Sequence, residues 1–223
     1  MSARDDVFRN IRRSLGVTGE EATRRRAVAE RLERTPRGVI PARGQVSGAE
    51  RLALFRKEAE SALATLAEVA SAAEVPQAVA EYLRKHNLPA AIRIGADERL
   101  ATMPWGATAL EVSRGRSDGA DLNAVSHAFA GVAESGTLVL VSGPDNPSTL
   151  NFLPDNHLVV VREKDLESDY ESVWARVRSA FGKAAMPRTV NWITGPSRSG
   201  DIEQTMLLGA HGPRRLHIVV VRD

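Results

Sequence analysis

Two stretches of the 223-residue sequence decide the fold: LVVV at residues 158–161 and LHIVVV at residues 216–221. Both are apolar and rich in β-branched side chains. Continuous runs of this kind are typical of strands buried on both faces, as in a parallel sheet that helices cover. Further strands are predicted at residues 90–94, 109–112, 138–141 and 190–194.

Helical patterns fill the intervals around these strands. The capping-box spacing of SGAE at residues 47–50 and the apolar face that follows it predict a long helix reaching residue 72. Pro76 suits the first turn of a second helix at residues 75–86, and a third helix is predicted at residues 170–181. Helices that alternate with buried strands predict an α/β sandwich with a largely parallel sheet.

The N-terminal part of the chain differs in composition from the rest. Apolar residues at helical spacing predict a short helix at residues 4–15, and the Pro- and Gly-rich residues 35–44 predict a linker. Residues 1–43 hold 11 arginines and six acidic residues, whereas the remainder holds 19 basic and 22 acidic residues. The interspersed acids favour a solvated arm over a nucleic-acid interface. We therefore expect a basic helical arm and linker at residues 1–46 and an α/β domain at residues 47–223.

Cysteine is absent from the sequence, which excludes disulfides, thiolate zinc sites, cysteine-held iron–sulfur clusters and a cysteine nucleophile. The five histidines form no metal-binding pattern, so neither a metal nor a cofactor is expected on this chain. Residues 1–16 lack the apolar core of a signal peptide, and no window approaches the roughly 20 apolar residues of a membrane span. We therefore expect a cytoplasmic protein with no membrane span and no nucleic-acid partner.

Two loops are candidates for a ligand site, because ligands of open α/β sheets bind beyond the carboxyl ends of strands. They lie at residues 143–151 and 195–203. The second, GPSRSGDIE, is expected to enter a short helix, whose N-terminal N–H groups together with Arg198 would bind a phosphate or a carboxylate. The alternative is a structural turn in which Ser199 or Asp201 caps that helix and Arg198 pairs with an acidic neighbour.

A further candidate is the glycine turn GVAESGT at residues 131–137, just before a predicted strand. Glu134 would act there as a nucleophile or a general base; the alternative is a turn in which its carboxylate accepts backbone hydrogen bonds. Thr137 stands where a P-loop has its lysine, which excludes that type of nucleotide site. His157 opens a buried strand, and the turn HGP at residues 211–213 is expected to end a helix and enter the last strand.

Four motifs occur together in an order that resembles the LUD-domain family. They are GVAESGTLVLVSG, LPDNHLVVV, GPSRSGDIE and LLGAHGPRRLHIVVV, beginning at residues 131, 153, 195 and 207. The resemblance covers about residues 47–223 and includes a helix before the domain. Four ordered motifs are far more specific than any one of them alone.

The resemblance implies a three-layer α/β/α sandwich similar to the sugar-phosphate isomerase and CoA-transferase fold. It also implies a role in oxidising L-lactate to pyruvate, in a system of three proteins. Two cysteine-rich partners would carry the iron–sulfur clusters, and this chain would be the cluster-free subunit. A small anionic metabolite would be its ligand.

The family's motifs also indicate site residues. Glu134 and His157 are the catalytic candidates, and the ligand-binding candidates are Ser135, Gly136, Thr137, Gly195, Ser197, Arg198, Ser199, Asp201, Glu203 and His211. The family often has Thr-Ala where this chain has Ser199-Gly200, a change that keeps the hydroxyl but loosens the turn.

Three functions remain open at this point. The first is the cluster-free subunit with an anion site at the strand-end loops. The second is a stand-alone enzyme acting on a phosphorylated or CoA-linked metabolite, and the third is a non-catalytic assembly subunit whose basic arm docks on a partner.

Overall fold

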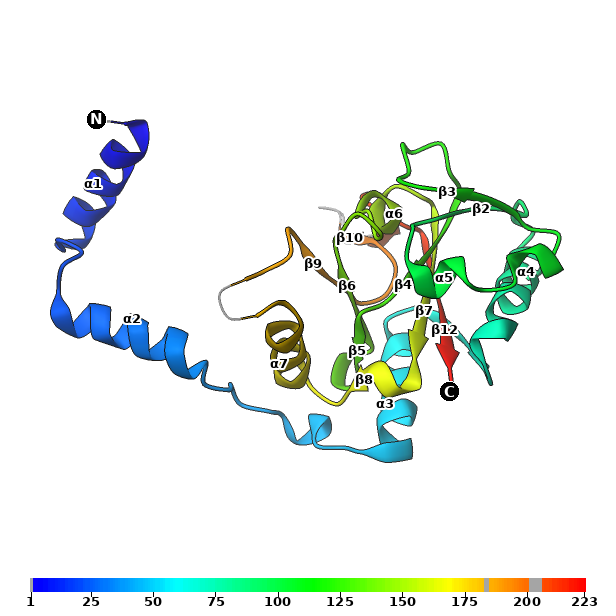
Figure 1. Cartoon of the computed structure of the whole chain (residues 1–223), viewed down its shortest axis with the longest axis horizontal. Coiled ribbons are helices and arrows are strands. Elements are labelled where there is room, and N and C mark those ends of the chain that lie inside the picture. Colours follow the sequence, from blue (N-terminus) through cyan, green and yellow to red (C-terminus); the bar gives the residue numbers. More distant parts are fainter. Residues whose placement is uncertain (1, 183–184, 201–205) are drawn as a thin grey trace. The chain divides into compact units, whose positions relative to one another are not determined.

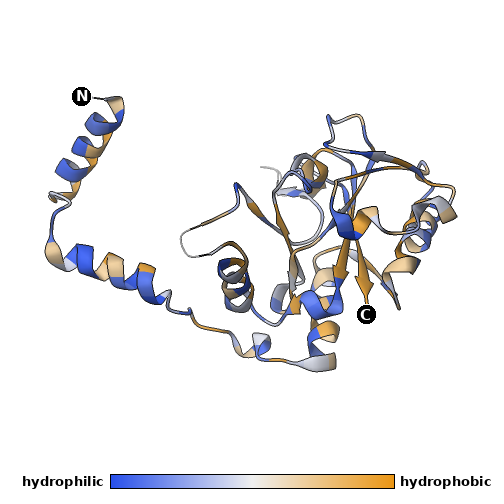
Figure 2. Ribbon diagram, viewed as in Figure 1, coloured by the Kyte–Doolittle hydropathy of each residue, from blue (hydrophilic) through white to orange (hydrophobic). Residues whose placement is uncertain are grey.

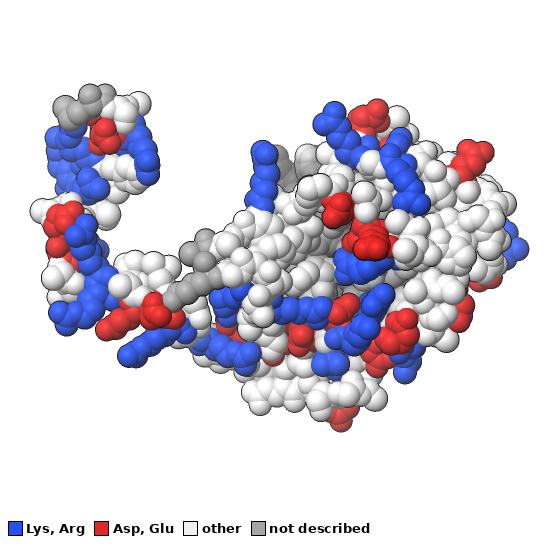
Figure 3. All heavy atoms as spheres, in the orientation of Figure 1, with Lys and Arg blue, Asp and Glu red and all other residues white. Residues whose placement is uncertain are grey.

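The computed structural model describes residues 2–182, 185–200 and 206–223, and it divides the chain into two units, Met1–Val39 and Ile40–Asp223. The first unit holds helices α1 (Ala3–Leu15) and α2 (Ala22–Arg34), neither of which has a buried residue. Helix α1 is the helix expected at residues 4–15: Ser2 begins it with a capping box and the left-handed Gly16 ends it. Figure 3 shows the arginines that cover this unit.

The second unit is built on a six-stranded sheet in which every neighbouring pair is parallel (Figure 1). In spatial order its strands are β1 (Thr65–Val69), β12 (Arg215–Val221), β7 (Asn156–Arg162), β4 (Asn123–His127), β2 (Ala91–Ile94) and β3 (Glu111–Arg114). Strands β7 and β12 pair along their whole length, and Figure 2 shows how apolar both are. They are the two runs that the sequence predicted to be buried on both faces.

A second sheet of four strands lies beside the first. Its order is β8 (Leu166–Glu167), β5 (Ala130–Val132), β6 (Thr137–Val141) and β9 (Val190–Ile193). The pairs β5–β6 and β6–β9 are antiparallel, so the predicted strands at residues 138–141 and 190–194 lie outside the parallel sheet. A separate hairpin joins β10 (Arg198–Gly200) to β11 (Met206–Leu208).

Apolar clusters connect the layers. Helix α4 (Val75–Lys85) covers one face of the six-stranded sheet, and helix α3 (Gly48–Ser61) with strand β6 covers the other. Helix α7 (Tyr170–Phe181) packs on the outer face of the second sheet. The α/β sandwich around a largely parallel sheet is thereby confirmed.

The shorter helices are α5 (Glu98–Ala101), α6 (Thr149–Phe152), η1 (Ala42–Gly44), η2 (Ala72–Glu74), η3 (Trp105–Ala107), η4 (Ala133–Ser135) and η5 (Glu163–Asp165). None of the helices in the described parts of the chain is long and apolar enough to cross a membrane.

The long helix predicted from residue 47 to residue 72 is wrong in its second half. Helix α3 ends at Ser61, and Leu63 then takes a left-handed conformation with φ of 71°. The chain continues as β1, whose residues pair with β12 in parallel register from Thr65 with His217 to Val69 with Val221. A short apolar run such as residues 65–69 fits the periodicity of a helix and of a strand equally well. Here pairing with the edge of the buried strand β12 makes it a strand.

In the loop from residue 195, which was expected to enter a short helix, residues 198–200 form a strand instead. Arg198 pairs with Leu208 and Gly200 with Met206, so β10 and β11 form an antiparallel hairpin. Residues 201–205, where the rest of that helix was expected, lie outside the described residues. The turn at residues 211–213 consequently follows a strand, and no helix N-terminus is available at residues 195–200 to bind an anion.

The second unit includes residues 40–46, which the sequence assigned to the linker. Gly44 is buried against the glycine turn: a Cβ atom at Gly44 would lie 3.1 Å from Glu134 Oε2 and 3.3 Å from Asp169 Cβ. This end of the linker is therefore part of the surface that covers Glu134.

Gly136 fixes the contact between that turn and α3. Its φ is +63°, and a Cβ atom there would lie 2.2 Å from the backbone nitrogen of Ala59. We expect Gly136→Ala to lower the free energy of unfolding by about 2–4 kcal/mol, because it combines strained backbone with overpacking. Gly106→Ala, at a position with nothing within 4 Å of the added Cβ, is the matched control. Urea unfolding of both variants measures the difference, and equal stabilities would contradict the prediction.

Candidate functional site

The structure separates the predicted site residues into two groups. The first is the glycine turn, where Glu134 is 4% exposed and its Oε1 accepts a hydrogen bond of 3.1 Å from the backbone N–H of Tyr170. Glu134 Oε2 is buried, and none of the described residues forms a hydrogen bond with it. Gly136 is covered by α3, so this turn presents its backbone to the interior.

Hydroxyl groups connect the glycine turn to the end of β9. Thr137 Oγ1 lies 2.8 Å from Ser135 Oγ, 3.0 Å from the Tyr170 hydroxyl and 2.6 Å from Thr194 Oγ1. Thr194 lines a cavity, whereas Glu134, Ser135 and Gly136 do not. The turn therefore reaches that cavity only through the contact of Thr137 with Thr194.

The second group lies around this cavity, which has a volume of about 280 Å³. Five predicted site residues line it: His157, Gly195, Ser197, Arg198 and His211. The other lining residues are Asn151, Phe152, Trp192, Ile193, Thr194, Pro196, Gly212, Pro213 and Leu216. Ser199 lies in β10 outside the lining, and Asp201 and Glu203 lie outside the described residues. We take this cavity as the candidate site.

Two lining residues, Asn151 and His157, form a hydrogen-bonded chain with Ser126, which does not itself line the cavity. We call these three buried side chains the polar floor. Ser126 Oγ donates a hydrogen bond of 3.2 Å to Asn151 Oδ1, and His157 Nε2 lies 3.0 Å from Ser126 Oγ. His157 is 1% exposed, and its burial lowers the pKa of the imidazole to about 3, so the ring is neutral at pH 7. Two atoms of this floor, His157 Nδ1 and Asn151 Nδ2, are buried and have no hydrogen-bond partner within the part of the chain that the structure describes.

Neighbouring elements position the floor. Ser126 lies on β4 and His157 on β7, and the parallel register brings them to the same face because Ala124 is paired with His157. The short helix α6, which contacts both strands, carries Asn151. The floor therefore requires three segments that are distant in the sequence.

The mouth of the cavity is a loop held to the last turn. Ser197 N–H donates to Pro213 O at 2.8 Å, and Gly209 N–H donates to Ser197 O at 3.0 Å. Gly195 has a φ of +72°, and a Cβ there would lie 2.0 Å from Ala62 O, so the loop also packs against the end of α3. Arg198 is exposed, and its Nη2 donates to Thr194 O at 3.4 Å.

Two members of the floor were missed by sequence reasoning. Asn151 ends the loop at residues 143–151, which was singled out for its composition but not assigned a role. Ser126 belongs to β4, whose sequence NAVSH has no continuous apolar run and was not predicted as a strand. The signal that could have led to them is His157 on the neighbouring strand, because a buried histidine requires a polar hydrogen-bond partner nearby.

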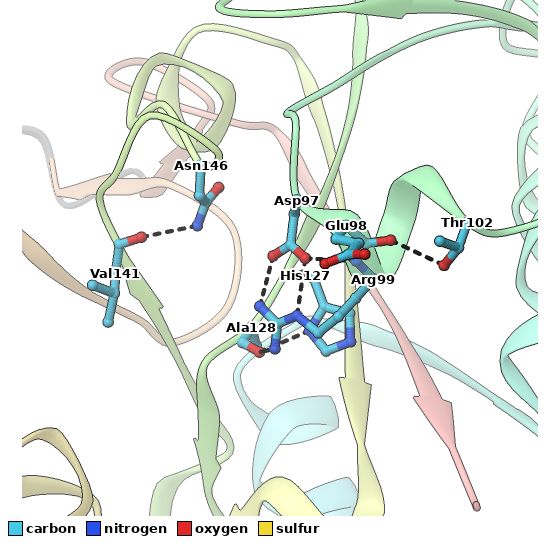
Figure 4. A network of polar contacts seen from close by, with 8 residues as sticks. All are labelled: Asp97, Glu98, Arg99, Thr102, His127, Ala128, Val141 and Asn146. Carbon is cyan, nitrogen blue, oxygen red and sulfur yellow. Dashed lines mark hydrogen bonds and ion pairs between the residues drawn. The ribbon is translucent and has the colours of Figure 1, made fainter. Parts of the chain in front are cut away.

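The cavity lies near the amino ends of β7 and β12, since His157 and Leu216 are the second residues of those strands. The carboxyl ends, where a ligand was expected, hold another polar network (Figure 4). Asp97 accepts two hydrogen bonds from the Arg99 guanidinium, at 2.9 Å and 2.6 Å. Arg99 Nη1 and His127 Nδ1 both donate to Ala128 O, at 3.3 Å and 2.8 Å. This network joins α5 to β4, and most of its polar groups satisfy one another.

Side chains at the cavity can hold a small ligand through hydrogen bonds and one cation. Asn151 Nδ2 is a donor, His157 is a neutral ring with one free nitrogen, and Arg198 supplies a positive charge at the mouth. Aromatic and aliphatic walls complete it. Within the described residues, no group of three or more histidine, aspartate or glutamate side chains is placed to bind a metal ion.

Comparison with known proteins identifies relatives of this chain. The sequence model of the LUD domain family matches residues 52–221. A protein named lactate utilization protein C from Deinococcus radiodurans is 33% identical over 162 residues, 68% of this chain and 70% of that protein. Another protein of that name, from Geobacillus thermodenitrificans, is 33% identical over 129 residues, 56% of this chain and 52% of that protein. The chain thus spans only about half the length of several curated relatives that it matches.

A solved structure is similar to the fold. The crystal structure of a DUF162 family protein from Deinococcus radiodurans has a TM-score of 0.55 and 27% sequence identity, covering 79% of this chain and 99% of that chain. The similarity therefore includes most of the second unit.

Three buried histidines give a prediction about acid stability. Burial lowers the pKa of His157 to about 3 and, as the first cause, that of His127 and His217 to about 4. The unfolded chain binds a proton at each ring near pH 6.5, so stability is complete above that pH and is lost as the pH falls. Each ring contributes a slope of about 1.4 kcal/mol per pH unit in this window.

We expect the free energy of unfolding to fall steeply between pH 6.5 and pH 5, a range above most carboxylate titrations. His157→Gln should lose about a third of the slope, because one of three contributing rings is removed. Urea unfolding at several pH values measures it. A flat profile in this range would show that the rings are not kept neutral by burial.

Proposed function

Because the chain belongs to the LUD domain family, we propose that it is the cluster-free subunit of an iron–sulfur system that oxidises L-lactate to pyruvate. The relatives named lactate utilization protein C support this role. The sequence holds no cysteine, so thiolate-held clusters would lie on partners, which we take to be two cysteine-rich proteins. In this proposal the chain itself holds no cofactor.

The cavity beside Arg198 would bind a small anionic metabolite. The observation that carries this proposal is the pair of buried, unpartnered polar atoms, His157 Nδ1 and Asn151 Nδ2, on side chains that line it. A buried polar atom without a partner costs about 1–3 kcal/mol, and a bound ligand that supplies a partner would recover that energy. Arg198 would hold the carboxylate by a forked pair of hydrogen bonds, with Ser197 as a further donor.

His157 has a defined part in this proposal. Its ring is neutral at pH 7, so it would meet the ligand through a hydrogen bond and not through an ion pair. Glu134, the other catalytic candidate, lies under Gly44 and Tyr170 and does not line the cavity. We therefore propose His157 as the group that contacts the ligand and Glu134 as a support of the turn.

Arg198→Ala tests the site. We expect the affinity for a small carboxylate such as L-lactate or pyruvate to fall at least tenfold, because the variant loses a charge-assisted pair, while the melting temperature changes little for an exposed side chain. Arg116→Ala, another exposed arginine, outside the cavity lining, is the matched control. Isothermal titration calorimetry measures both variants.

Unchanged binding in Arg198→Ala would exclude this arginine from the site. If the chain binds sugar phosphates or CoA and neither acid, the stand-alone enzyme acting on a phosphorylated or CoA-linked metabolite becomes the better hypothesis.

A second candidate function is an assembly role for the first unit. Four apolar side chains of α1 follow one another at helical spacing and remain exposed: Val7 by 56%, Phe8 by 43%, Ile11 by 47% and Leu15 by 64%. A helix of this length is marginal in water unless its apolar face is covered, which favours a protein partner.

Deleting residues 1–39 tests this role. We expect the remaining chain to unfold cooperatively at nearly the same temperature, since the deletion follows the boundary between the two units. If α1 docks on the iron–sulfur partners, the truncated chain should no longer co-elute with them in gel filtration. A complex that survives the deletion would remove the arm from the assembly hypothesis.

A further inference from the structure

Strand β1 lies at one end of the six-stranded sheet, with β12 on one side and no strand of the described residues on the other. Val69 O accepts a hydrogen bond of 3.0 Å from the N–H of Arg222, just beyond β12, so the backbone of Val69 faces the sheet. Successive residues of a strand alternate in direction, so Leu66 and Glu68 point their N–H and C=O groups to the open side. The open side therefore offers four backbone groups for pairing with another strand.

The two edges of this sheet differ in their exposure to solvent. Strand β3 exposes three of its four residues, including the charged Glu111 and Arg114, and charged edges of this kind discourage pairing with another chain. Of the five residues of β1, only Thr65 is exposed. The charged residue of β1, Glu68, forms an ion pair of 2.7 Å with Arg222. Strand β1 is thus the edge that is suited to receive a strand.

A groove with a volume of about 540 Å³ follows this open edge and is lined by all five residues of β1 and by helix α4. Glu74 Oε2 accepts a hydrogen bond of 3.2 Å from the backbone N–H of Ala70, so the start of α4 lies beside the end of β1. Tyr82, near the end of α4, stacks on His217, which pairs with Thr65 at the start of β1. Helix α4 is therefore antiparallel to β1.

The α4 side of the groove carries opposite charges at its two ends. Glu74 lies beside the end of β1, and Lys85 lies in the last turn of α4, beside the start of β1. Both side chains are exposed. Between them, Gln77 Nε2 donates a hydrogen bond of 3.0 Å to Glu81 Oε1. A surface whose charge reverses along its length is complementary to a copy of itself that is turned end to end.

We propose that a second copy of this chain binds at this edge, with the two β1 strands pairing antiparallel about a two-fold axis at Ala67. Leu66 of each copy faces Glu68 of the other, and the outward backbone groups of these residues form four hydrogen bonds in the dimer. Ala67 faces its own counterpart at about 4.5 Å between Cα atoms, a close approach that suits a small side chain. Glu74 of each copy faces Lys85 of the other.

The flanking helices fit this arrangement. Helix α4 contacts both β1 and β12, so it lies over that pair of strands. Neighbouring strands lie about 4.8 Å apart, so the α4 helices of the two copies would be separated by about two strand spacings, close to the usual distance between packed helices. On the other face of the sheet, Arg222 compensates the charge of Glu68 in each copy, so the two carboxylates do not oppose the pairing.

Sedimentation equilibrium of the full chain tests the association. We expect a mass near twice 24.1 kDa that falls toward that of one chain on dilution. Lys85→Glu brings two carboxylates together at each of two symmetric contacts and should weaken the association about tenfold. Adding Glu74→Lys to this variant makes the charges opposite again and should restore the association. Arg116→Glu, the same change of charge at an exposed residue outside the groove lining, should leave it unchanged.

Amide hydrogen exchange, followed by nuclear magnetic resonance, tests whether the dimer forms through β1. We expect the N–H groups of Leu66 and Glu68 to exchange slowly at concentrations where the chain is a dimer and faster after dilution. The N–H of Ala67 faces β12 and should exchange slowly at both concentrations, so it serves as the internal control.

The inference is overturned if the chain stays monomeric up to about 1 mM. It is also overturned by a dimer in which Leu66 and Glu68 exchange as fast as in the monomer, because that dimer would form through another surface. A monomer in which these two amides are protected would show that another segment of the same chain covers the edge. Equal association of Lys85→Glu and Arg116→Glu would contradict the end-to-end arrangement. None of these results depends on the proposed carboxylate site, which Arg198→Ala tests separately.

Discussion

The parallel pairing of β7 with β12 is the contact on which the rest of the structure depends. Leu158–Val161 and the facing residues of β12 are all fully or almost fully buried, and they supply the apolar clusters on both sides of the sheet. Strand β12 lies between β1 and β7, so the sheet is complete only when β12 has paired with both. That closure gives β1 its partner and sets His157 beside Leu216, where the cavity begins.

The same burial gives the candidate site its chemistry. A histidine at the second position of a buried strand loses most of its hydration, which keeps it neutral and makes each unmet hydrogen bond costly. Ser126 Oγ forms a hydrogen bond with His157 Nε2, and no described residue forms one with His157 Nδ1. In these apolar surroundings, a few polar atoms determine which hydrogen bonds a ligand could form. At the carboxyl ends of the strands, by contrast, the polar groups of Asp97, Arg99 and His127 already form hydrogen bonds with one another or with Ala128 O.

Local patterns predicted much of the fold and part of the site. The two apolar runs, α4 and α7 were found because their periodicity agrees with their final environment. The second half of the long helix failed at Leu63, since Thr65–Val69 becomes a strand only by pairing with β12. Strand β4 was missed because its polar residues face partners that no local pattern reveals: Asn123 bonds backbone near β2, and Ser126 bonds His157.

The sequence by itself determined the α/β class, the buried strands and, through four ordered motifs, the family. It also singled out His157 and the loop from Gly195, which remain candidates for the site. The class and the strands follow from composition and periodicity, and the family follows from the order of the motifs. Only the tertiary structure decided that Arg198 sits on a hairpin and not at a helix N-terminus, that Glu134 is covered by Gly44, and that Ser126, Asn151 and His157 meet. The reason is physical: a hydrogen-bonded floor is assembled from separate segments by strand register and helix packing, and neither is encoded within a single segment.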